Sequence, residues 1–156
     1  MTMADTVKKR LAEQGIDYEV VTHSETGASM ETAAAAHVSG EKMAKAVVLK
    51  DAEGYLVAVM PATYRLGTGE LYDLLGRHLE MAGEDELPGL FGDCDLGAVP
   101  PVADAYGIET VCDEGLAKLD DVYFEGGDHT SLVRVSGEDF MKLMGDARRG
   151  VFSHHA

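Results

Sequence analysis

The stretch AKAVVLKDAEGYLVAVMP, residues 44–61, decides the fold of this chain. Two apolar runs, 45–51 and 55–60, flank a short glycine-containing turn at 52–54. Two strand-like runs joined by such a turn are typical of a β-hairpin. We therefore predict a hairpin here, closed at its end by Pro61.

Shorter segments on both sides of the hairpin alternate between helical and strand patterns. The predicted helices cover residues 3–14, 33–36, 69–75, 84–91 and 137–144, with Ser29, Thr68 and Ser136 capping the second, third and fifth. The predicted strands cover residues 16–22, 108–111, 122–125 and 130–135. Short turns between these segments favour hairpins over long crossovers. We expect a mixed α/β fold, with a largely antiparallel sheet and short helices around it.

The length of 156 residues fits one ordinary domain with a proper core. We expect this domain to cover residues 1–147 and residues 148–156 to form a flexible tail. The chain has no tryptophan and few aromatic residues, which argues against a module that stacks nucleic-acid bases.

The composition also predicts where the protein works. The first ten residues are polar and charged, without the apolar core of a signal peptide, and no apolar run is long enough to cross a membrane. Cys94 and Cys112 are too few for a disulfide framework or a zinc site. We therefore expect a cytoplasmic protein with free thiols and without a metal. A protein that binds the RNA backbone is expected to carry a basic face, and the net charge of -15 is unusual for such a protein.

Lys45 is the first candidate for chemistry because it stands at the mouth of a strand expected to be buried. Burying an ammonium group without a partner costs several kcal/mol. Its side chain could extend along the apolar surface so that the ammonium group reaches water. It could equally be a fixed cation for a phosphate or carboxyl group.

Two glycine turns supply the other candidates. The turn at 96–101 is stiffened by two prolines, and Gly97 could let backbone N–H groups approach a substrate carbonyl or could simply join two elements. The turn at 126–130 carries His129, which is either a surface residue or a ligand-binding one. Asp128 either orients this histidine or completes the turn. No phosphate-binding or dinucleotide-binding glycine motif is present.

The ordered combination of residues 44–50, 97–101 and 126–129 resembles the YbaK-like family of aminoacyl-tRNA deacylases. This family includes free-standing bacterial proteins and the editing insertion of bacterial prolyl-tRNA synthetase. The resemblance extends from about Met30 to about Met144. It implies an editing hydrolase that cleaves the aminoacyl ester at the 3′-terminal adenosine of a mischarged tRNA.

The resemblance also implies roles for individual residues. The family's matching lysine, Lys45 here, is essential to deacylation and contacts the terminal adenosine. Gly97, with its neighbours Ala98 and Pro100, would hold the carbonyl oxygen, while His129 and Gly127 would shape the aminoacyl site. The base would be the substrate's own ribose hydroxyl acting through water. No metal or organic cofactor is implied.

Family members clear amino acids mistaken for similar ones, so we expect a small uncharged residue such as alanine, cysteine, serine or threonine. Candidate pocket residues are Val47, Met60 and the region 36–43. The acidic chain would bind the tRNA acceptor end weakly, with a synthetase or elongation factor as possible help. The alternatives are a non-catalytic binding module, which the acidic charge favours, and a hydrolase of a small free ester. A positively charged surface around Lys45 would support binding of tRNA. An acidic surface there would support the alternatives.

Overall fold

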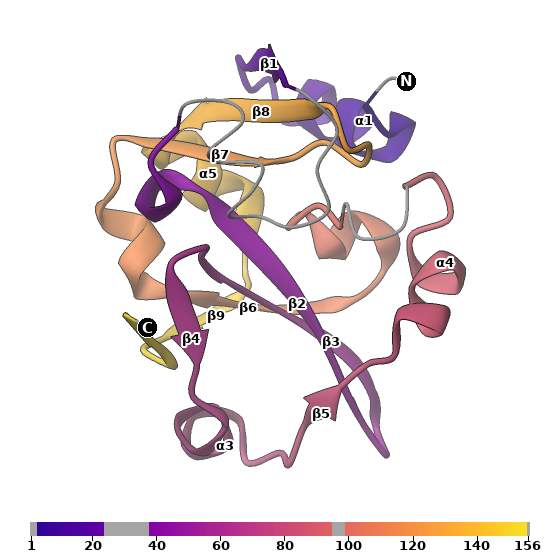
Figure 1. Ribbon diagram of the computed structural model, residues 1–156, viewed down its shortest axis with the longest axis vertical. Coiled ribbons are helices and arrows are strands. Elements are labelled where there is room, and N and C mark those ends of the chain that lie inside the picture. Colours follow the sequence, from indigo (N-terminus) through magenta and orange to yellow (C-terminus); the bar gives the residue numbers. More distant parts are fainter. Residues whose placement is uncertain (1–2, 24–37, 95–98, 156) are drawn as a thin grey trace.

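The computed structural model of the protein describes residues 3–23, 38–94 and 99–155 (Figure 1). The α-helices and 3₁₀ helices (η) in these ranges are α1 Asp5–Glu13, η1 Gly40–Lys42, α3 Thr68–Leu75, η2 Glu84–Glu86, α4 Leu87–Leu90, η3 Ala103–Tyr106, η4 Glu114–Lys118 and α5 Gly137–Met144. The strands are β1 Glu19–Thr22, β2 Ala44–Asp51, β3 Gly54–Pro61, β4 Tyr64–Leu66, β5 Glu80–Met81, β6 Glu109–Asp113, β7 Asp121–Glu125, β8 Ser131–Ser136, β9 Arg148–Gly150 and β10 Ser153–His155.

The predicted hairpin is confirmed and forms the centre of the larger sheet. Strands β2 and β3 pair antiparallel from Ala44 opposite Pro61 to Asp51 opposite Gly54. They lie within a five-stranded sheet of order β5-β2-β3-β6-β9, in which β6 runs parallel to β3 and β9 parallel to β6. The smaller sheets, β1-β8-β7 and β10-β4, are antiparallel. The expected mixed, largely antiparallel α/β fold is therefore confirmed.

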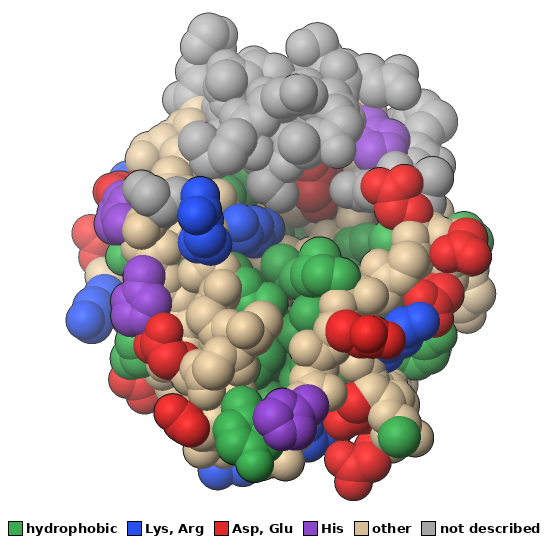
Figure 2. Space-filling model, turned by 60° about the horizontal axis from the view of Figure 1, so that its bottom comes forward, with side chains coloured by type: hydrophobic (Ala, Val, Ile, Leu, Met, Phe, Trp, Pro, Cys, Tyr) green, Lys and Arg blue, Asp and Glu red, His purple; other side chains and the backbone are tan. Residues whose placement is uncertain are grey.

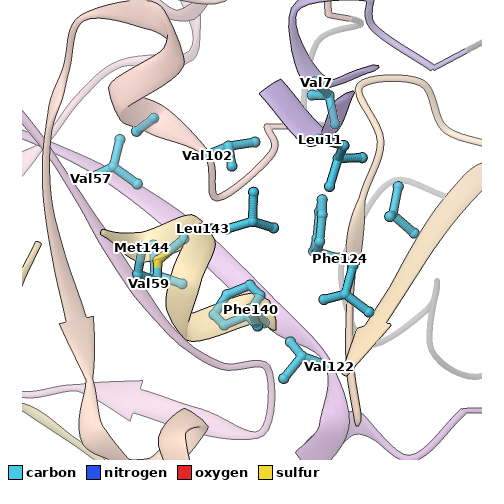
Figure 3. Packing of buried hydrophobic residues seen from close by; sticks show 14 of the residues in the cluster. Val7, Leu11, Val57, Val59, Val102, Val122, Phe124, Phe140, Leu143 and Met144 are labelled. Atoms are coloured by element: carbon cyan, nitrogen blue, oxygen red, sulfur yellow. The ribbon is translucent and has the colours of Figure 1, made fainter. Parts of the chain in front are cut away.

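The main core fills the space between the two larger sheets (Figure 3). Helix α5 places Phe140, Leu143 and Met144 among side chains of β3, β7 and α1, and the cluster includes Val57 and Phe124. Phe124 and Phe140 are fully buried with ring centroids 6.0 Å apart. The predicted cap of this helix is confirmed. The Ser136 hydroxyl accepts a hydrogen bond from the Asp139 backbone N–H at 3.1 Å.

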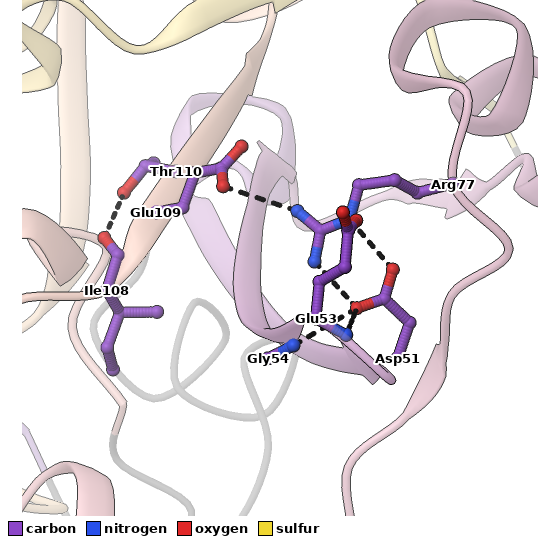
Figure 4. Close-up of polar contacts among 7 residues, drawn as sticks. All are labelled: Asp51, Glu53, Gly54, Arg77, Ile108, Glu109 and Thr110. Atoms are coloured by element: carbon purple, nitrogen blue, oxygen red, sulfur yellow. Dashed lines mark hydrogen bonds and ion pairs between the residues drawn. The ribbon is translucent and has the colours of Figure 1, made fainter.

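A charged cluster fastens the turn of the hairpin to its surroundings (Figure 4). The Arg77 guanidinium donates to both carboxylate oxygens of Asp51 at 2.8 Å and also pairs with Glu53 and Glu109 at 3.2 Å. The hydrogen bond from Arg77 lowers the pKa of Asp51 to about 2. The backbone N–H groups of Glu53 and Gly54 add hydrogen bonds to the same carboxylate. These contacts hold the far end of β2 and β3 in a fixed position.

The C-terminal segment differs from the sequence prediction. We expected a flexible tail over 148–156, but β9 joins the larger sheet beside β6 and β10 pairs with β4. Between the two strands, Phe152 is fully buried. The cause is a buried carboxylate, Asp113, that accepts hydrogen bonds from the backbone N–H groups of Phe152 and Ser153 at 3.1 Å and from the Ser153 hydroxyl at 2.7 Å.

Two helix predictions also need correction. Thr68 is the first residue of α3, and Gly67 occupies the cap position without a side chain to donate or accept. The helix predicted over 84–91 is divided into η2 and the short helix α4, because Pro88 starts a new first turn. The helix predicted at 33–36, with its cap Ser29, lies outside the described residues.

Candidate active site around Lys45

Lys45 lies on the open edge of the larger sheet. Among the described residues, β5 pairs with β2 only at Leu49 and Lys50, so the part of β2 around Lys45 has a sheet neighbour on one side. The Lys45 Nζ donates a hydrogen bond to the backbone carbonyl of Tyr64 at 2.7 Å. Partial burial lowers the pKa of Lys45 from its ordinary value of 10.5. The ammonium group is thus held in place on the protein rather than extended into water.

A large cleft opens on one side of this lysine, between β2 and the strands β4, β5 and β10. Its volume is about 660 Å³, and its lining residues are Lys45, Val47, Ala62, Thr63, Tyr64, Arg65, Leu66, Met81 and His155. Figure 2 shows a hollowed face with hydrophobic side chains in the hollow and basic side chains along one side. None of the described lining residues is acidic. The cleft therefore favours a ligand that carries negative charge and apolar surface.

Two polar groups of the cleft need a closer description. The Thr63 hydroxyl is buried and has no hydrogen-bond partner among the described residues. Buried hydroxyl groups almost always have a partner, so this group is suited to bind a ligand atom. His155 stacks at a tilt on Tyr64, with ring centroids 4.7 Å apart, and its Nε2 lies 2.9 Å from Glu41 Oε1. The C-terminal strand thus belongs to the wall of the candidate site.

A small pocket adjoins the same stretch of β2. Its volume is about 220 Å³, and it is lined by Ala44, Lys45, Ala46, Val47, Val48, Met81, Ala82, Glu84, Leu87, Val99 and Glu125. Most of these side chains are apolar. The two acidic residues differ in burial, because Glu84 is exposed whereas Glu125 is only 6% exposed. This pocket combines apolar walls with a buried carboxylate, the opposite charge to that of the large cleft.

The helix α4 wall of the small pocket is held by a polar cluster. Glu86 accepts hydrogen bonds from the Tyr55 hydroxyl at 2.6 Å, from Lys50 at 2.9 Å and from the Gly83 backbone N–H at 2.6 Å. These hydrogen bonds, that of Tyr55 first, lower the pKa of Glu86 to about 2. They hold Glu86 in place directly before Leu87, which lines the pocket.

The three segments singled out in the sequence approach one another here to different degrees. Lys45 lines both cavities, and Val99 of the proline turn lines the small one, as does Glu125, which immediately precedes the second glycine turn. Pro100 is buried beside Val99. Gly97 and Ala98 lie outside the described residues, so their roles stay predictions.

The glycine turn itself is explained by packing. A Cβ on Gly127, at φ +103°, would lie 2.6 Å from the Ala4 Cβ and 3.2 Å from the Cys94 Sγ. Asp128 completes the turn, because its carboxylate accepts from the backbone N–H groups of Thr130 and Ser131. His129 is partly exposed and is not among the described residues lining either cavity. Contacts of His129 and Gly127 with a substrate stay predictions.

Of the residues predicted to line the amino-acid pocket, some lie at the two cavities and others do not. Val47 lines both cavities, as expected. Met60 instead lies fully buried in a second core cluster, because β3 is covered on that face. In the region 36–43, residues 36 and 37 lie outside the described residues, while Met43 is buried in a third cluster.

Sequence reasoning missed several lining residues, among them Thr63, Arg65, Glu125 and His155. Glu125 had a local signal: it is an acid at the end of a strand whose Val122 and Phe124 are apolar. Arg65 and His155 had none, because they reach the cleft through the pairing of β4 with β10, which are distant in sequence.

Among the described residues, no group of three or more His, Cys, Asp or Glu side chains is arranged to hold a metal ion. No helix in the described part of the chain is long and apolar enough to cross a membrane.

The fold and the paired cavities define a small α/β domain with a lysine between two ligand-sized spaces. A profile of the aminoacyl-tRNA editing domain matches residues 23–143, and the chain therefore belongs to the aminoacyl-tRNA editing domain family. The resemblance to editing enzymes noted in the sequence is thus confirmed at the level of this family. None of the curated proteins compared with the chain matches it.

Solved structures share the fold over nearly the whole chain. The crystal structure of the hypothetical protein APE2540 is 26% identical, with a TM-score of 0.84, and the match covers 96% of this chain and 100% of that one. A second structure, described provisionally as a trans-editing enzyme for prolyl-tRNA synthetase, is 23% identical with a TM-score of 0.82. That match covers 98% of this chain and 99% of the other. Both support the mixed α/β editing-domain fold.

Proposed function

We propose that this protein hydrolyses the aminoacyl ester of a mischarged tRNA that carries a small uncharged amino acid. Membership of the editing domain family supports ester hydrolysis on tRNA in general. The observation that carries the finer proposal is that Lys45 lines two cavities of unequal size and opposite charge. One cavity suits the end of a tRNA and the other suits the attached amino acid.

The large cleft suits the 3′-terminal nucleotide. Lys45, Arg65 and His155 offer cationic or hydrogen-bonding groups to phosphate and ribose oxygens. The Thr63 hydroxyl adds a buried group in need of a partner. The apolar floor, which includes Leu66, suits the face of the base. The basic side chains at this cleft support the tRNA proposal, although the whole chain is acidic and the neighbouring small pocket carries Glu84 and Glu125.

The small pocket suits a small aminoacyl group. Its volume of about 220 Å³ is below the roughly 300–1,000 Å³ of pockets that enclose drug-sized ligands. Its apolar walls, such as Ala46, Leu87 and Val99, favour an uncharged side chain. Alanine, cysteine, serine and threonine fit this description.

The reaction needs little beyond positioning and charge stabilisation, because the ester is already activated. Water attacks the acyl carbon, the bond between that carbon and the ribose oxygen breaks, and the ribose hydroxyl leaves with a proton. In the mechanism we propose, the neighbouring ribose hydroxyl acts as the base through water, and Lys45 anchors the nucleotide. Gly97 is the predicted source of backbone donors for the oxyanion.

The test is a panel of one tRNA species charged with alanine, cysteine, serine, threonine or a larger amino acid. We expect the purified protein to accelerate release of at least one small amino acid above the spontaneous rate. Release of none would contradict the proposal and favour a binding module. Equal activity on free amino acid methyl esters would instead favour a hydrolase of small esters.

A further inference from the structure

The two cavities meet at the open edge of β2. Lys45 and Val47 share one face of this strand with Leu49, because side chains alternate along a strand. Met81 of β5 stands opposite Leu49 in the antiparallel pair, so its side chain leaves the sheet on the same face. Among the described residues, those that line both cavities are Lys45, Val47 and Met81. A ligand that occupies both cavities therefore passes over this edge, with Lys45 toward one end and Met81 toward the other.

Met81 is unusually open to solvent for a large apolar side chain. It is 64% exposed, the highest value among the exposed large hydrophobic residues of the described chain. Strand β5, which Figure 1 shows at the margin of the sheet, is only two residues long. Its backbone is nevertheless fixed to β2 by strand pairing and by a hydrogen bond of 3.0 Å from the Ala82 backbone N–H to the Val48 carbonyl. A fixed backbone thus presents an exposed thioether at the junction of the cavities.

This exposure sets Met81 apart from the other methionines. In the described part of the chain, the others are buried or partly buried: Met3, Met43, Met60, Met141 and Met144. Met1 and Met30 lie outside the described residues. Methionine is oxidised to its sulfoxide, and oxidation is selective for sites that an oxidant can reach. Among the described methionines, a peroxide should therefore react with Met81 first.

Resting on the proposed function, we infer that Met81 is a redox modification site whose oxidation to the sulfoxide weakens binding of the substrate. Hydrogen peroxide transfers one oxygen atom to the thioether sulfur. The O–O bond breaks, an S–O bond forms, the sulfur gives up two electrons and the peroxide is reduced to water. Methionine sulfoxide reductases reverse the change, with a dithiol as the reductant that becomes a disulfide.

The sulfoxide changes the chemistry of the junction. The thioether of Met81 is flexible and apolar, and its sulfur makes favourable contacts with aromatic rings such as a nucleic-acid base. The sulfoxide oxygen is polar and has to lose bound water when a ligand covers it. Because Met81 lines both cavities, this penalty falls on a ligand that extends from one to the other.

The first experiment follows the oxidation itself, which does not depend on the proposed function. The protein is treated with hydrogen peroxide, and the sulfoxide at each methionine is measured by mass spectrometry of its peptides. We expect Met81 to be oxidised before Met43, Met60 and Met144, which are buried. Oxidation of these buried methionines at the same rate as Met81 would overturn the inference.

The second experiment measures kcat/KM on a responsive mischarged tRNA, as the ratio of oxidised to untreated protein for each variant. A dithiol added after the peroxide restores oxidised thiols of Cys94 and Cys112 but leaves methionine sulfoxide. We expect the wild type and the control Met141→Leu to lose roughly three- to tenfold, the effect of one sulfur–aromatic contact, and to recover with the reductases. Met81→Leu should keep the activity of its own untreated form. An equal loss in Met81→Leu would overturn the inference.

The third experiment measures binding without hydrolysis, which separates this inference from the proposed function. The probe is 3′-alanylamino-3′-deoxyadenosine, a stable amide that carries both the nucleoside and the amino acid, with affinity measured by calorimetry. Oxidised wild type should bind it roughly three- to tenfold more weakly than untreated wild type, whereas Met81→Leu should show no such difference. This result would support the inference even if no mischarged tRNA were hydrolysed. Unchanged affinity after oxidation, or no binding of the probe by untreated protein, would overturn it.

Discussion

At the scale of single residues, Lys45 is the group on which both cavities depend. Its Nζ is held by the Tyr64 carbonyl at 2.7 Å, at the edge of the sheet and outside the core clusters. We predict that Lys45→Ala lowers kcat/KM on a responsive tRNA by roughly 10- to 100-fold, the loss of one charged hydrogen bond. Urea denaturation should show little change. Lys42→Ala, a change of an exposed neighbour, is the control. If Lys45→Ala hydrolysed the tRNA ester as fast as Lys42→Ala, Lys45 would be excluded from the reaction.

The size of the small pocket gives a second prediction at this scale. Leu87 forms one wall, and Leu87→Ala would enlarge the space for the amino acid. We expect the ratio of valyl-tRNA to alanyl-tRNA hydrolysis to rise by about tenfold, since a few methylene groups in an apolar pocket discriminate at that level. Leu90→Ala, in the same helix but not among the described lining residues, should leave the ratio unchanged. An identical rise in both variants would point to a loosened helix rather than to a pocket wall.

At the scale of elements, a single carboxylate connects the C-terminal strand to the site. Asp113 ends β6 and receives hydrogen bonds from Gly115, Phe152 and Ser153, which place β10 and its His155 beside the cleft. Asp113→Ala leaves these donors without their acceptor and should lower the free energy of unfolding by about 2–3 kcal/mol. Ser153→Ala removes one of the bonds and should cost about 1 kcal/mol. Urea denaturation measures both, and a smaller loss for Asp113→Ala would contradict this account.

The Glu86 cluster, which positions helix α4, predicts a dependence of stability on pH. The pKa of Glu86 is lowered from 4.5 to about 2 in the folded protein, so its contribution is complete above pH 4.5 and is lost as pH falls toward 2. In urea denaturation at about pH 7 and about pH 3, Glu86→Gln should lose less stability on acidification than the wild type. Glu84→Gln is the control. If the wild type and Glu86→Gln lose the same stability on acidification, the loss belongs to other carboxylates, such as Asp51.

These elements also show which features a sequence pattern can predict. The hairpin at 44–61 and the cap at Ser136 were predictable because their signals are local: two apolar runs, a glycine turn between them, and a serine three residues before Asp139. Strands β9 and β10 were not, because each has three residues and is held by Asp113 and by strand pairings distant in sequence.

The residues of the candidate site likewise include some that the sequence indicates and some that it does not. Lys45 and the proline turn stand out in the sequence because a lysine beside an apolar run and two adjacent prolines are unusual. Arg65 and His155 look like ordinary surface residues until β4 and β10 pair. The opposite charge of the two cavities arises only from this assembly, so the sequence does not indicate it.

At the scale of the whole molecule, the net charge of -15 opposes the approach of a polyanion. The basic side chains at the large cleft are few, and the other pocket is acidic. This distribution supports contact with the acceptor end and argues against an extended footprint on tRNA. A synthetase or elongation factor that presents the charged end would offset the weak attraction, which is the kind of partner we propose.

The salt dependence of tRNA binding tests this distribution of charge. Each neutralised phosphate adds somewhat less than one to the slope of log affinity against log salt. With Lys45, Arg65 and His155 as the contacting groups, we expect a slope on the order of -1 to -3 for the protein alone. Arg65→Ala should make the slope shallower by about one, whereas Arg148→Ala, away from the cleft, should not change it. A slope of about -6 or steeper is expected for six or more phosphate contacts. Tight binding with such a slope would require a long basic surface and would contradict contact limited to the acceptor end.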